Sequence, residues 1–290
     1  MNSLIYNNKE MGKKILIFTD LDGTLLDYHT YSYEKALPAL RYIRKKEIPL
    51  IICTSKTRAE IEAYQKKLKN RHPFISENGG AIFIPQHYFK KMPASLRKRN
   101  GYVIKELGTP YQVLRGKLKD IAGRFNQDVK GFGDMKAQEI HSKYGVPLRE
   151  ARLSKKREYD EPFNFVALPD EKIVRDMVKE FAKGGLHMVK GGRLFHLMGN
   201  NDKGKAARWM KKIYEKVWKK KVVTVGIGDS LNDLPLLLEV DLPVVVKLTT
   251  GIYEEEIVKQ LKGPLLTGGI GPEGWNEAVL QILRRMGGDT

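Results

Sequence analysis

Residues 14–24 read KILIFTDLDGT, an apolar run rich in β-branched residues that ends in two aspartates, a glycine and a threonine. Such a run predicts a strand that is buried on both faces and carries carboxylates at its carboxyl end. If the chain stays extended there, Asp20 and Asp22 point to the same side, and Gly23 permits a sharp turn after them. Two carboxylates this close repel each other. We therefore expect a hard divalent cation beside them, with one oxygen left as a nucleophile.

A second acidic motif lies near the other end of the chain. Residues 226–233 read GIGDSLND and follow the apolar segment 222–227, which predicts another buried strand. If a helix begins directly afterwards, Asp229 and Asp233 lie on neighbouring turns that face the strand end. They could then meet the first aspartate pair and complete an oxygen-rich magnesium site. The dinucleotide-binding pattern G-x-G-x-x-G is excluded, because Leu231 stands where its third glycine belongs.

Two other residues stand where a phosphate could be bound. Thr54 ends a predicted strand, so its hydroxyl and amide could hold the phosphate, with Ser55 as a neighbouring candidate. Lys203 begins a predicted helix, whose amino end favours anions, and its ammonium could neutralise a phosphate and a nucleophilic carboxylate. Structural roles stay open for both, as a strand-end cap and an ordinary first-turn lysine. Lys56 and Asn232 adjoin these motifs and are further candidates for substrate contact.

The spacing of strands and helices predicts an α/β fold with a doubly wound, parallel, Rossmann-like core sheet. Strands alternate with helices up to about residue 108, and the same rhythm returns after residue 192. Between these stretches, helical patterns surround short strands and predict a separate α+β module. We therefore expect a core domain, 1–108 with 192–290, that is interrupted by an inserted cap domain, 109–191.

Short local signals predict individual elements. The sequence TRAE at residues 57–60 is a capping box that begins a helix. Segment 81–85 is predicted to pair with segment 102–107 as a hairpin, and residues 147–159 show a helical pattern. The basic segment 86–100 has no predicted place in the fold.

Composition limits the class of protein. The chain has 290 residues, of which 41% are hydrophobic and 30% are charged, as is usual for soluble proteins of about two domains. No apolar run approaches the ~20 residues of a membrane helix, and the polar first dozen residues lack the core of a signal peptide. Cys53 is the single cysteine, which excludes an intrachain disulfide framework and a cysteine-rich zinc site. We expect a cytoplasmic protein that does not bind membranes.

The charge balance raises the question of a polyanionic partner. The chain has 52 Lys and Arg against 34 Asp and Glu, a formal net charge of +18. The lysines are spread over predicted helix faces with Glu between them, as on solvated or heat-adapted surfaces. We therefore expect a small anionic substrate and no nucleic acid, although a basic nucleic-acid-binding protein is the alternative from another functional class.

The motifs occur in the order D-x-D-G-T, strand-terminal Thr, Lys and G-D-x-x-x-D. This order resembles the haloacid dehalogenase-like hydrolase superfamily, whose Cof-like members carry a cap at the place of the insert. The resemblance implies that Asp20 attacks phosphorus, that Asp22 is the general acid and base, and that Thr54 and Lys203 hold the phosphoryl oxygens. It implies Mg²⁺ as cofactor, and its implied ligands are the four aspartates of the two acidic motifs: Asp20, Asp22, Asp229 and Asp233.

A narrower resemblance extends over nearly the whole chain. Its motifs are TSKTRAE at 54–60, GFGDM at 131–135, REYDEPF at 157–163 and GGRLFHLMG at 191–199. They look like those of the mannosyl-3-phosphoglycerate phosphatase family. This resemblance implies hydrolysis of mannosyl-3-phosphoglycerate to mannosylglycerate, a compatible solute, and phosphate.

Such a substrate needs an arginine fork for its carboxylate and several partners for its hydroxyl groups. Arg157, Arg193 and His196 could supply cationic or donor groups, and Glu158 or Asp160 could accept from sugar hydroxyls. Each could equally belong to a structural salt bridge. Glu77 and Asn78 begin the turn below the predicted cap and are candidates for supporting contacts.

The epimer of the sugar is not readable from the sequence. A glucosyl-3-phosphoglycerate phosphatase, another sugar-phosphate phosphatase and a phosphomutase with the same aspartyl-phosphate are the alternatives among enzymes. The oligomeric state is also not readable.

Overall fold

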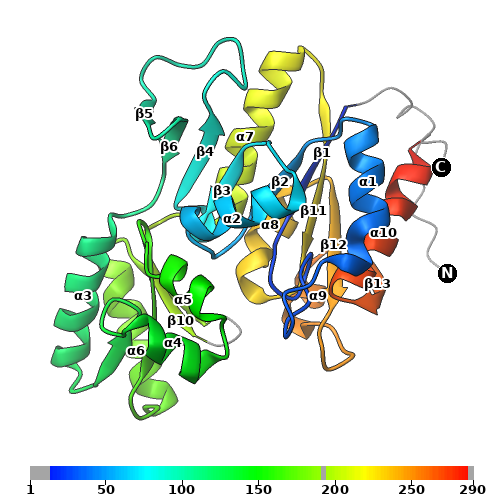
Figure 1. The fold of residues 1–290 in the computed structure, drawn as a ribbon. Helices are drawn as coiled ribbons and strands as arrows, with labels where there is room; N and C mark the ends of the chain where they lie inside the picture. The colour runs from blue at the N-terminus through cyan, green and yellow to red at the C-terminus, as the bar shows by residue number, and fades with distance from the viewer. Residues whose placement is uncertain (1–13, 191–193, 287–290) are drawn as a thin grey trace. The chain divides into compact units, whose positions relative to one another are not determined.

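The structure, a computed structural model, describes residues 14–190 and 194–286. The chain forms two compact units, Met1–Cys53 with Ala207–Thr290 and Thr54–Ala206. Figure 1 labels most helices and strands of both units. Among the described residues, no helix has the length and apolar character needed to cross a membrane.

The first unit contains a parallel sheet, as the alternation of strands and helices predicts. Its strands have the order β13-β12-β11-β1-β2, and each pairs in parallel with its neighbours. The bounds are β1 Lys14–Thr19, β2 Leu50–Cys53, β11 Val222–Gly228, β12 Leu242–Lys247 and β13 Leu265–Ile270. The register joins Lys14 to Val222 and Thr19 to Ile227, so β1 and β11 end at the same edge of the sheet. This edge is where α/β sheets place their ligands.

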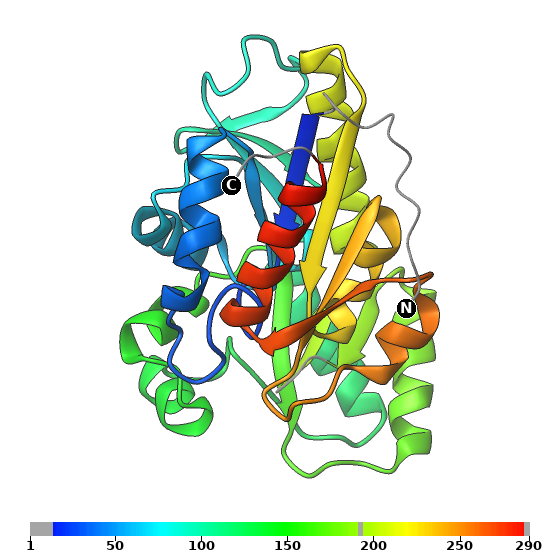
Figure 2. The same ribbon diagram turned by 90° about the vertical axis from the view of Figure 1, so that its right-hand side faces the viewer.

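Helices cover both faces of this sheet. Figure 2 shows α10 crossing in front of β1 with α1 beside it, and α8 packs against β11 and β12 on the opposite side. The bounds are η2 Glu34–Ala36, α1 Leu37–Lys45, η4 Leu231–Asp233, α8 Leu234–Glu239, α9 Glu255–Gln260 and α10 Pro272–Arg285. Helix α7, Lys203–Trp218, contains the boundary between the two units. The apolar residues of β1 and β2 are therefore buried on both sides, as their uninterrupted apolar sequence predicts.

The second unit begins with an antiparallel sheet of order β3-β4-β6-β5. Its elements are α2 Arg58–Leu68, β3 Phe74–Ser76, η3 Glu77–Gly79, β4 Ala81–Pro85, β5 Arg97–Arg99 and β6 Tyr102–Glu106. The predicted hairpin is confirmed, because Ala81 pairs with Glu106 and Pro85 with Tyr102. The basic segment contributes β5, an exposed edge strand of three cationic residues, and such charges protect an edge from pairing with other chains.

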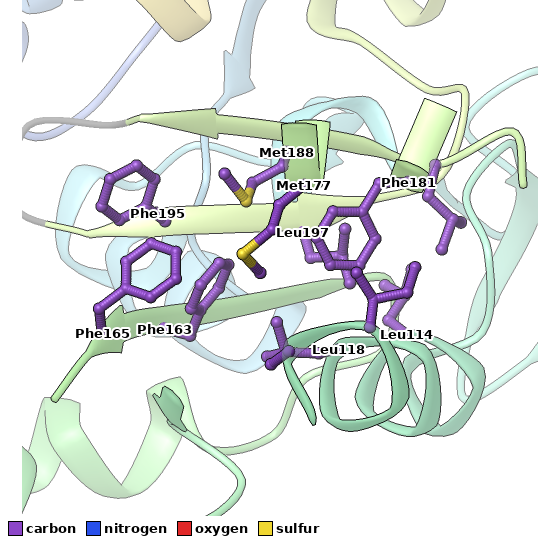
Figure 3. Close-up of a cluster of buried hydrophobic side chains, with 12 residues drawn as sticks. Leu114, Leu118, Phe163, Phe165, Met177, Phe181, Met188, Phe195 and Leu197 are labelled. Atoms are coloured by element: carbon purple, nitrogen blue, oxygen red, sulfur yellow. The ribbon is translucent and has the colours of Figure 1, made fainter. Parts of the chain in front are cut away.

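The rest of the second unit is an antiparallel sheet of order β7-β8-β10-β9 with helices packed on it. Figure 3 shows its core, in which Phe163 and Leu197 of the sheet lie against Leu118 of α3 and Phe181 of α6. The strands are β7 Val129–Gly131, β8 Asp160–Phe165, β9 His187–Lys190 and β10 Phe195–Met198. The helices are α3 Tyr111–Arg124, α4 Ala137–Tyr144, α5 Leu148–Ser154 and α6 Glu171–Lys183.

Two features differ from the sequence-based expectation. The predicted boundary between residues 191 and 192 divides this sheet, because β10 pairs with both β8 and β9. A strand of four residues has no local mark that tells which sheet it joins. The helix predicted over 147–159 ends at Ser154, because the chain then turns into β8 at Asp160. The division into core and cap stays a prediction.

The capping box of α2 gives a test of local stability. Thr57 accepts from the Glu60 amide, the Glu60 carboxylate accepts from the Thr57 amide, and both side chains are buried. We expect Thr57→Ala to lower the free energy of unfolding by about 1 kcal/mol, because one capping acceptor is lost. Denaturant unfolding measures this change. Thr57→Ser keeps the hydroxyl and is the matched control, so equal losses in both variants would contradict the capping role.

Candidate active site

Three aspartates come together at the carboxyl edge of the parallel sheet. Asp20 follows β1, Asp229 follows β11, and Asp233 ends η4; one carboxylate oxygen from each lies within 4.8 Å of the others. All three are buried, Asp233 completely. Carboxylates so close in a region of low dielectric favour a bound cation or protonation. The oxygen-only donor set fits a hard divalent ion such as Mg²⁺.

The turn after β1 wraps closely around Asp229. The amide of Asp20 donates to the carbonyl of Ile227 at 2.9 Å, which extends the pairing of the two strands by one residue. The Thr24 hydroxyl donates to Asp229 Oδ1 at 3.0 Å. Gly23 has a φ of +78°, and a Cβ on it would lie 2.5 Å from Asp229 Oδ2. In D-x-D-G-T, the glycine therefore leaves room for the Asp229 side chain and the threonine donates a hydrogen bond to it.

Asp233 stabilises its own loop and is also one of the three aspartates of the group. Its Oδ2 accepts from the amides of Asp229 at 3.1 Å and Ser230 at 3.2 Å. A Cβ on Gly228 would lie 2.4 Å from Asp233 Cγ, so the loop can close only over a glycine. The four-residue spacing of the motif therefore results from a capping box that aims both carboxylates to one place.

A buried tryptophan is linked to Asp20 through the hydroxyl of Thr19. Trp275 of α10 donates from Nε1 to the Thr19 hydroxyl at 3.0 Å, and this hydroxyl donates to the carbonyl of Asp20 at 2.7 Å. Trp275 and Thr19 are both completely buried. Sequence reasoning did not find this support, because nothing local marks one tryptophan of a C-terminal helix as a partner of the first strand.

Asp22 does not belong to the group of three aspartates that the described residues form. The chain leaves the extended conformation after Asp20: the amides of Thr24 and Leu26 both donate to the carbonyl of Leu21. The alternation by two residues, on which the expected pairing of Asp20 and Asp22 rested, therefore stops at this turn. Asp22 bridges to Leu26 and is half-buried.

Comparisons with known proteins agree with these features. A family model described as haloacid dehalogenase-like hydrolase matches residues 17–250. The chain is 46% identical over 271 residues to a glucosyl-3-phosphoglycerate/mannosyl-3-phosphoglycerate phosphatase of Methanococcoides burtonii, covering 93% of this chain and 97% of the relative. The chain belongs to the haloacid dehalogenase-like hydrolases and, within them, to the mannosyl-3-phosphoglycerate phosphatase family.

Other members of the family are similar over most of their length. A relative of Persephonella marina with the same double name is 41% identical, with 94% of this chain and 98% of the relative covered. A mannosyl-3-phosphoglycerate phosphatase of Pyrococcus furiosus is 34% identical, with 80% and 90% covered. A phosphatase of the superfamily from Bacteroides thetaiotaomicron has a TM-score of 0.65 at 19% identity and covers 99% of both chains, which shows a shared fold.

The two other motif residues of the family lie in the second unit. Thr54 directly follows β2 and is buried; its amide donates to the Ile75 carbonyl at 3.2 Å, and its carbonyl accepts from the Asn78 amide at 3.1 Å. Lys203 is the first residue of α7, as predicted, and is completely buried. That both hold the phosphoryl group stays a prediction.

The three further substrate candidates, Lys56, Ser55 and Asn232, all have partners within the protein. The Lys56 ammonium is buried 3.7 Å from Glu60 Oε1. The Ser55 carbonyl accepts from Arg157 at 2.7 Å. Asn232 Oδ1 accepts from the Ser230 hydroxyl at 2.7 Å. Their substrate contacts stay predictions.

The predicted substrate residues of the cap are also partners of one another or of the fold. The Arg157 guanidinium donates to the carbonyls of Ser55 and Ser154 and lies 3.8 Å from Asp160 Oδ2. Glu158 pairs with Arg58 at 2.9 Å. His196 Nδ1 lies 2.8 Å from Asp160 Oδ2, and the Asp160 side chain is completely buried. Arg193 lies outside the described residues.

The aspartate group predicts a stabilising effect of Mg²⁺ that needs no substrate. At a free concentration ten times its dissociation constant, a cation that binds only the folded protein adds about 1.4 kcal/mol to the free energy of unfolding. We expect this increase in the wild type and its loss in Asp229→Asn, which removes one of three charges. Thermal unfolding with and without Mg²⁺ measures both. Asp176→Asn, on the exposed face of α6, is the control; if Asp229→Asn keeps the full increase, the cation binds elsewhere.

Proposed function

We propose that this chain is a Mg²⁺-dependent phosphatase that hydrolyses mannosyl-3-phosphoglycerate to mannosylglycerate and inorganic phosphate. The observation that carries the proposal is the group of three buried aspartates at the end of β1 and β11, in a chain 46% identical to a relative named for this activity. A small phosphorylated sugar-glycerate, rather than nucleic acid, is the proposed partner, and the reducing cytoplasm is the proposed compartment, in agreement with the single buried thiol of Cys53.

The proposed reaction has two displacement steps at phosphorus. A carboxylate oxygen of Asp20 forms a bond to phosphorus, the bond to the glycerate oxygen breaks, and Asp22 gives its proton to this leaving alkoxide. Asp22 then takes a proton from a water that attacks the aspartyl-phosphate, and phosphate leaves as the Asp20 carboxylate is restored. Mg²⁺ held by Asp20, Asp229 and Asp233 would screen the negative charges of carboxylate and phosphate from each other.

Thr54 and Lys203 are the proposed holders of the phosphoryl oxygens. A completely buried ammonium at the amino end of a sixteen-residue helix is costly to desolvate, which supports a role with an anionic substrate. In the proposed division, residues 1–108 and 192–290 carry this chemistry, and the cap, 109–191, selects the sugar-glycerate and excludes bulk water. Asp22 acts as acid and base from its position on the turn after β1.

Glucosyl-3-phosphoglycerate is the second candidate substrate. The relatives that are 46% and 41% identical both carry the glucosyl name as well as the mannosyl name. The two sugars differ in one epimeric hydroxyl. A pocket that does not bury a partner for that hydroxyl discriminates weakly between them.

A substitution of the nucleophile tests the chemistry. We expect Asp20→Asn to lower kcat by at least about 10³-fold, because a carboxamide does not form the aspartyl-phosphate. We also expect the melting temperature to stay equal or rise, because one of three repelling charges is removed. Phosphate release and thermal unfolding measure the two effects. A folded variant that keeps a substantial fraction of the activity would remove Asp20 from this role.

The substrate is tested by phosphate release over a panel of phosphorylated glycosides with Mg²⁺. We expect kcat/KM for mannosyl- and glucosyl-3-phosphoglycerate to exceed that for sucrose phosphate by at least about tenfold, since only the former carry the glycerate carboxylate. Transfer of phosphate within the sugar without its release would instead indicate a mutase.

A further inference from the structure

The turn after β3 has an unusual backbone. Glu77, Asn78 and Gly79 follow one another with φ of 47°, 54° and 87°, all in the left-handed region. Glycine adopts this region freely and asparagine tolerates it, but glutamate does so at a cost. Strained residues persist where the surrounding contacts hold them, and they cluster at functional sites.

The backbone of the turn holds the Thr54 segment. The amide of Asn78 donates to the Thr54 carbonyl at 3.1 Å, and the amide of Glu77 donates to the Lys56 carbonyl at 3.1 Å. These bonds determine where the loop that carries Thr54 can lie. The turn is therefore joined directly to one of the two residues proposed to hold the phosphoryl group.

The side chains of the turn hold the start of β8. Glu77 Oε2 accepts from the amides of Glu158 at 3.0 Å and Tyr159 at 2.7 Å, and Oε1 accepts from the Glu158 amide at 3.0 Å. Asn78 Nδ2 donates to Asp160 Oδ2 at 3.0 Å, the carboxylate beside His196. The turn thus fixes the segment from which the predicted substrate residues extend.

The same turn also holds the chain before α7. Asn201 Nδ2 donates to the Asn78 carbonyl at 3.2 Å. A Cβ on Gly79 would lie 2.1 Å from the Asp202 carbonyl oxygen and 3.0 Å from the Lys203 nitrogen. Three segments that are far apart in the sequence therefore meet at one turn, within a single compact unit.

A negative charge on Glu77 is not needed to hold the two backbone amides, because a neutral side-chain oxygen can also accept hydrogen bonds from them. Glu77 is completely buried, and burial raises the pKa of its carboxyl to about 8, with the nearby charge of Arg157 acting in the opposite direction. Buried acids with raised pKa values are concentrated at functional sites. The position of Glu77 between the proposed phosphate-binding and sugar-binding residues agrees with such a role.

We propose that Glu77 and Asn78 are positioning residues of the phosphatase reaction, which hold Thr54 and Lys203 in place relative to the Asp160–His196 pair. The proposal rests on the proposed function, because it assumes the roles of these four residues. The Glu77 carboxylate anchors the turn to the start of β8, and the backbone of the anchored turn holds the segments of Thr54 and Lys203, so Glu77 affects kcat through the turn. Asn78 positions Asp160 and thereby affects substrate affinity.

Three variants test the proposal by steady-state kinetics. We expect Glu77→Ala to lower kcat/KM by about 30-fold, mainly in kcat, because misplacement by a fraction of an ångström is costly in an oriented site. For Glu77→Gln, kcat/KM should stay within about threefold of wild type, because a single oxygen in the place of Oε2 can accept from both amides. Asn78→Gly keeps the left-handed backbone but loses the bond to Asp160, so KM should rise about tenfold with kcat nearly unchanged.

The matched control is Glu150→Ala in the same unit. Glu150 is also a buried glutamate and accepts from the Tyr64 hydroxyl at 2.8 Å, but it has no link to the turn in the contacts described above. We expect it to lower the melting temperature and to leave kcat and KM unchanged. If Glu77→Ala behaves in the same way, the turn is structural and the proposal is overturned. If Glu77→Ala does not fold, an unchanged KM in Asn78→Gly overturns it.

Hydrogen exchange separates a failure of this proposal from a failure of the proposed function. In Glu77→Ala, and not in Glu150→Ala, we expect faster exchange in peptides that cover residues 54–56 and 201–203 as well as 158–159. Faster exchange at 158–159 alone would overturn the positioning role. If the wild type releases no phosphate from either glycosyl-3-phosphoglycerate while the exchange result holds, the proposed substrate is wrong and the coupling of the segments stands.

Discussion

Repulsion among Asp20, Asp229 and Asp233 is the constraint on which the first unit depends. At an effective dielectric constant of about 20, two unit charges 4.8 Å apart repel by about 3.5 kcal/mol, and the group contains three such pairs. Domains are stable by only about 5–15 kcal/mol, so the group needs a fold that holds it together, and a bound cation or protonation would relieve the repulsion. The parallel register of β1 and β11, the glycine turns and the Trp275–Thr19 support all hold these carboxylates together.

In the second unit, the constraint is the cost of burying polar side chains, and hydrogen bonds between distant segments meet it. Its polar side chains at the start of β8 are buried, and a buried polar group is costly unless it has a hydrogen-bonding partner. Asp160 is surrounded by Asn78, His196 and Arg157, and Glu77 accepts from two backbone amides. The strained turn supplies two of these groups, the Asn78 amide and the Glu77 carboxyl. Rigid attachment of this kind is what an oriented binding site requires.

The elements that the sequence predicts well are those whose signals are local. The uninterrupted apolar runs of β1 and β2, the capping box at Thr57 and the hairpin of β4 with β6 are all confirmed. The prediction of a helix over 147–159 was wrong beyond Ser154. The helical pattern of side chains continues past that residue, but the backbone turns there and enters β8 at Asp160. The sheet partner of β10 could not be predicted, since a short apolar strand fits either sheet.

The sequence by itself determined the two acidic motifs, their places at the ends of buried strands and the family, because these depend on residue types at short spacings. Only the tertiary structure decided which carboxylates meet. It separates Asp22 from the aspartate group, and it joins Trp275 to Thr19 and Asn78 to Asp160. The reason is physical: these pairs are 256 and 82 residues apart, and a hydrogen bond between distant segments depends on how the backbone packs, which no short pattern of residues records.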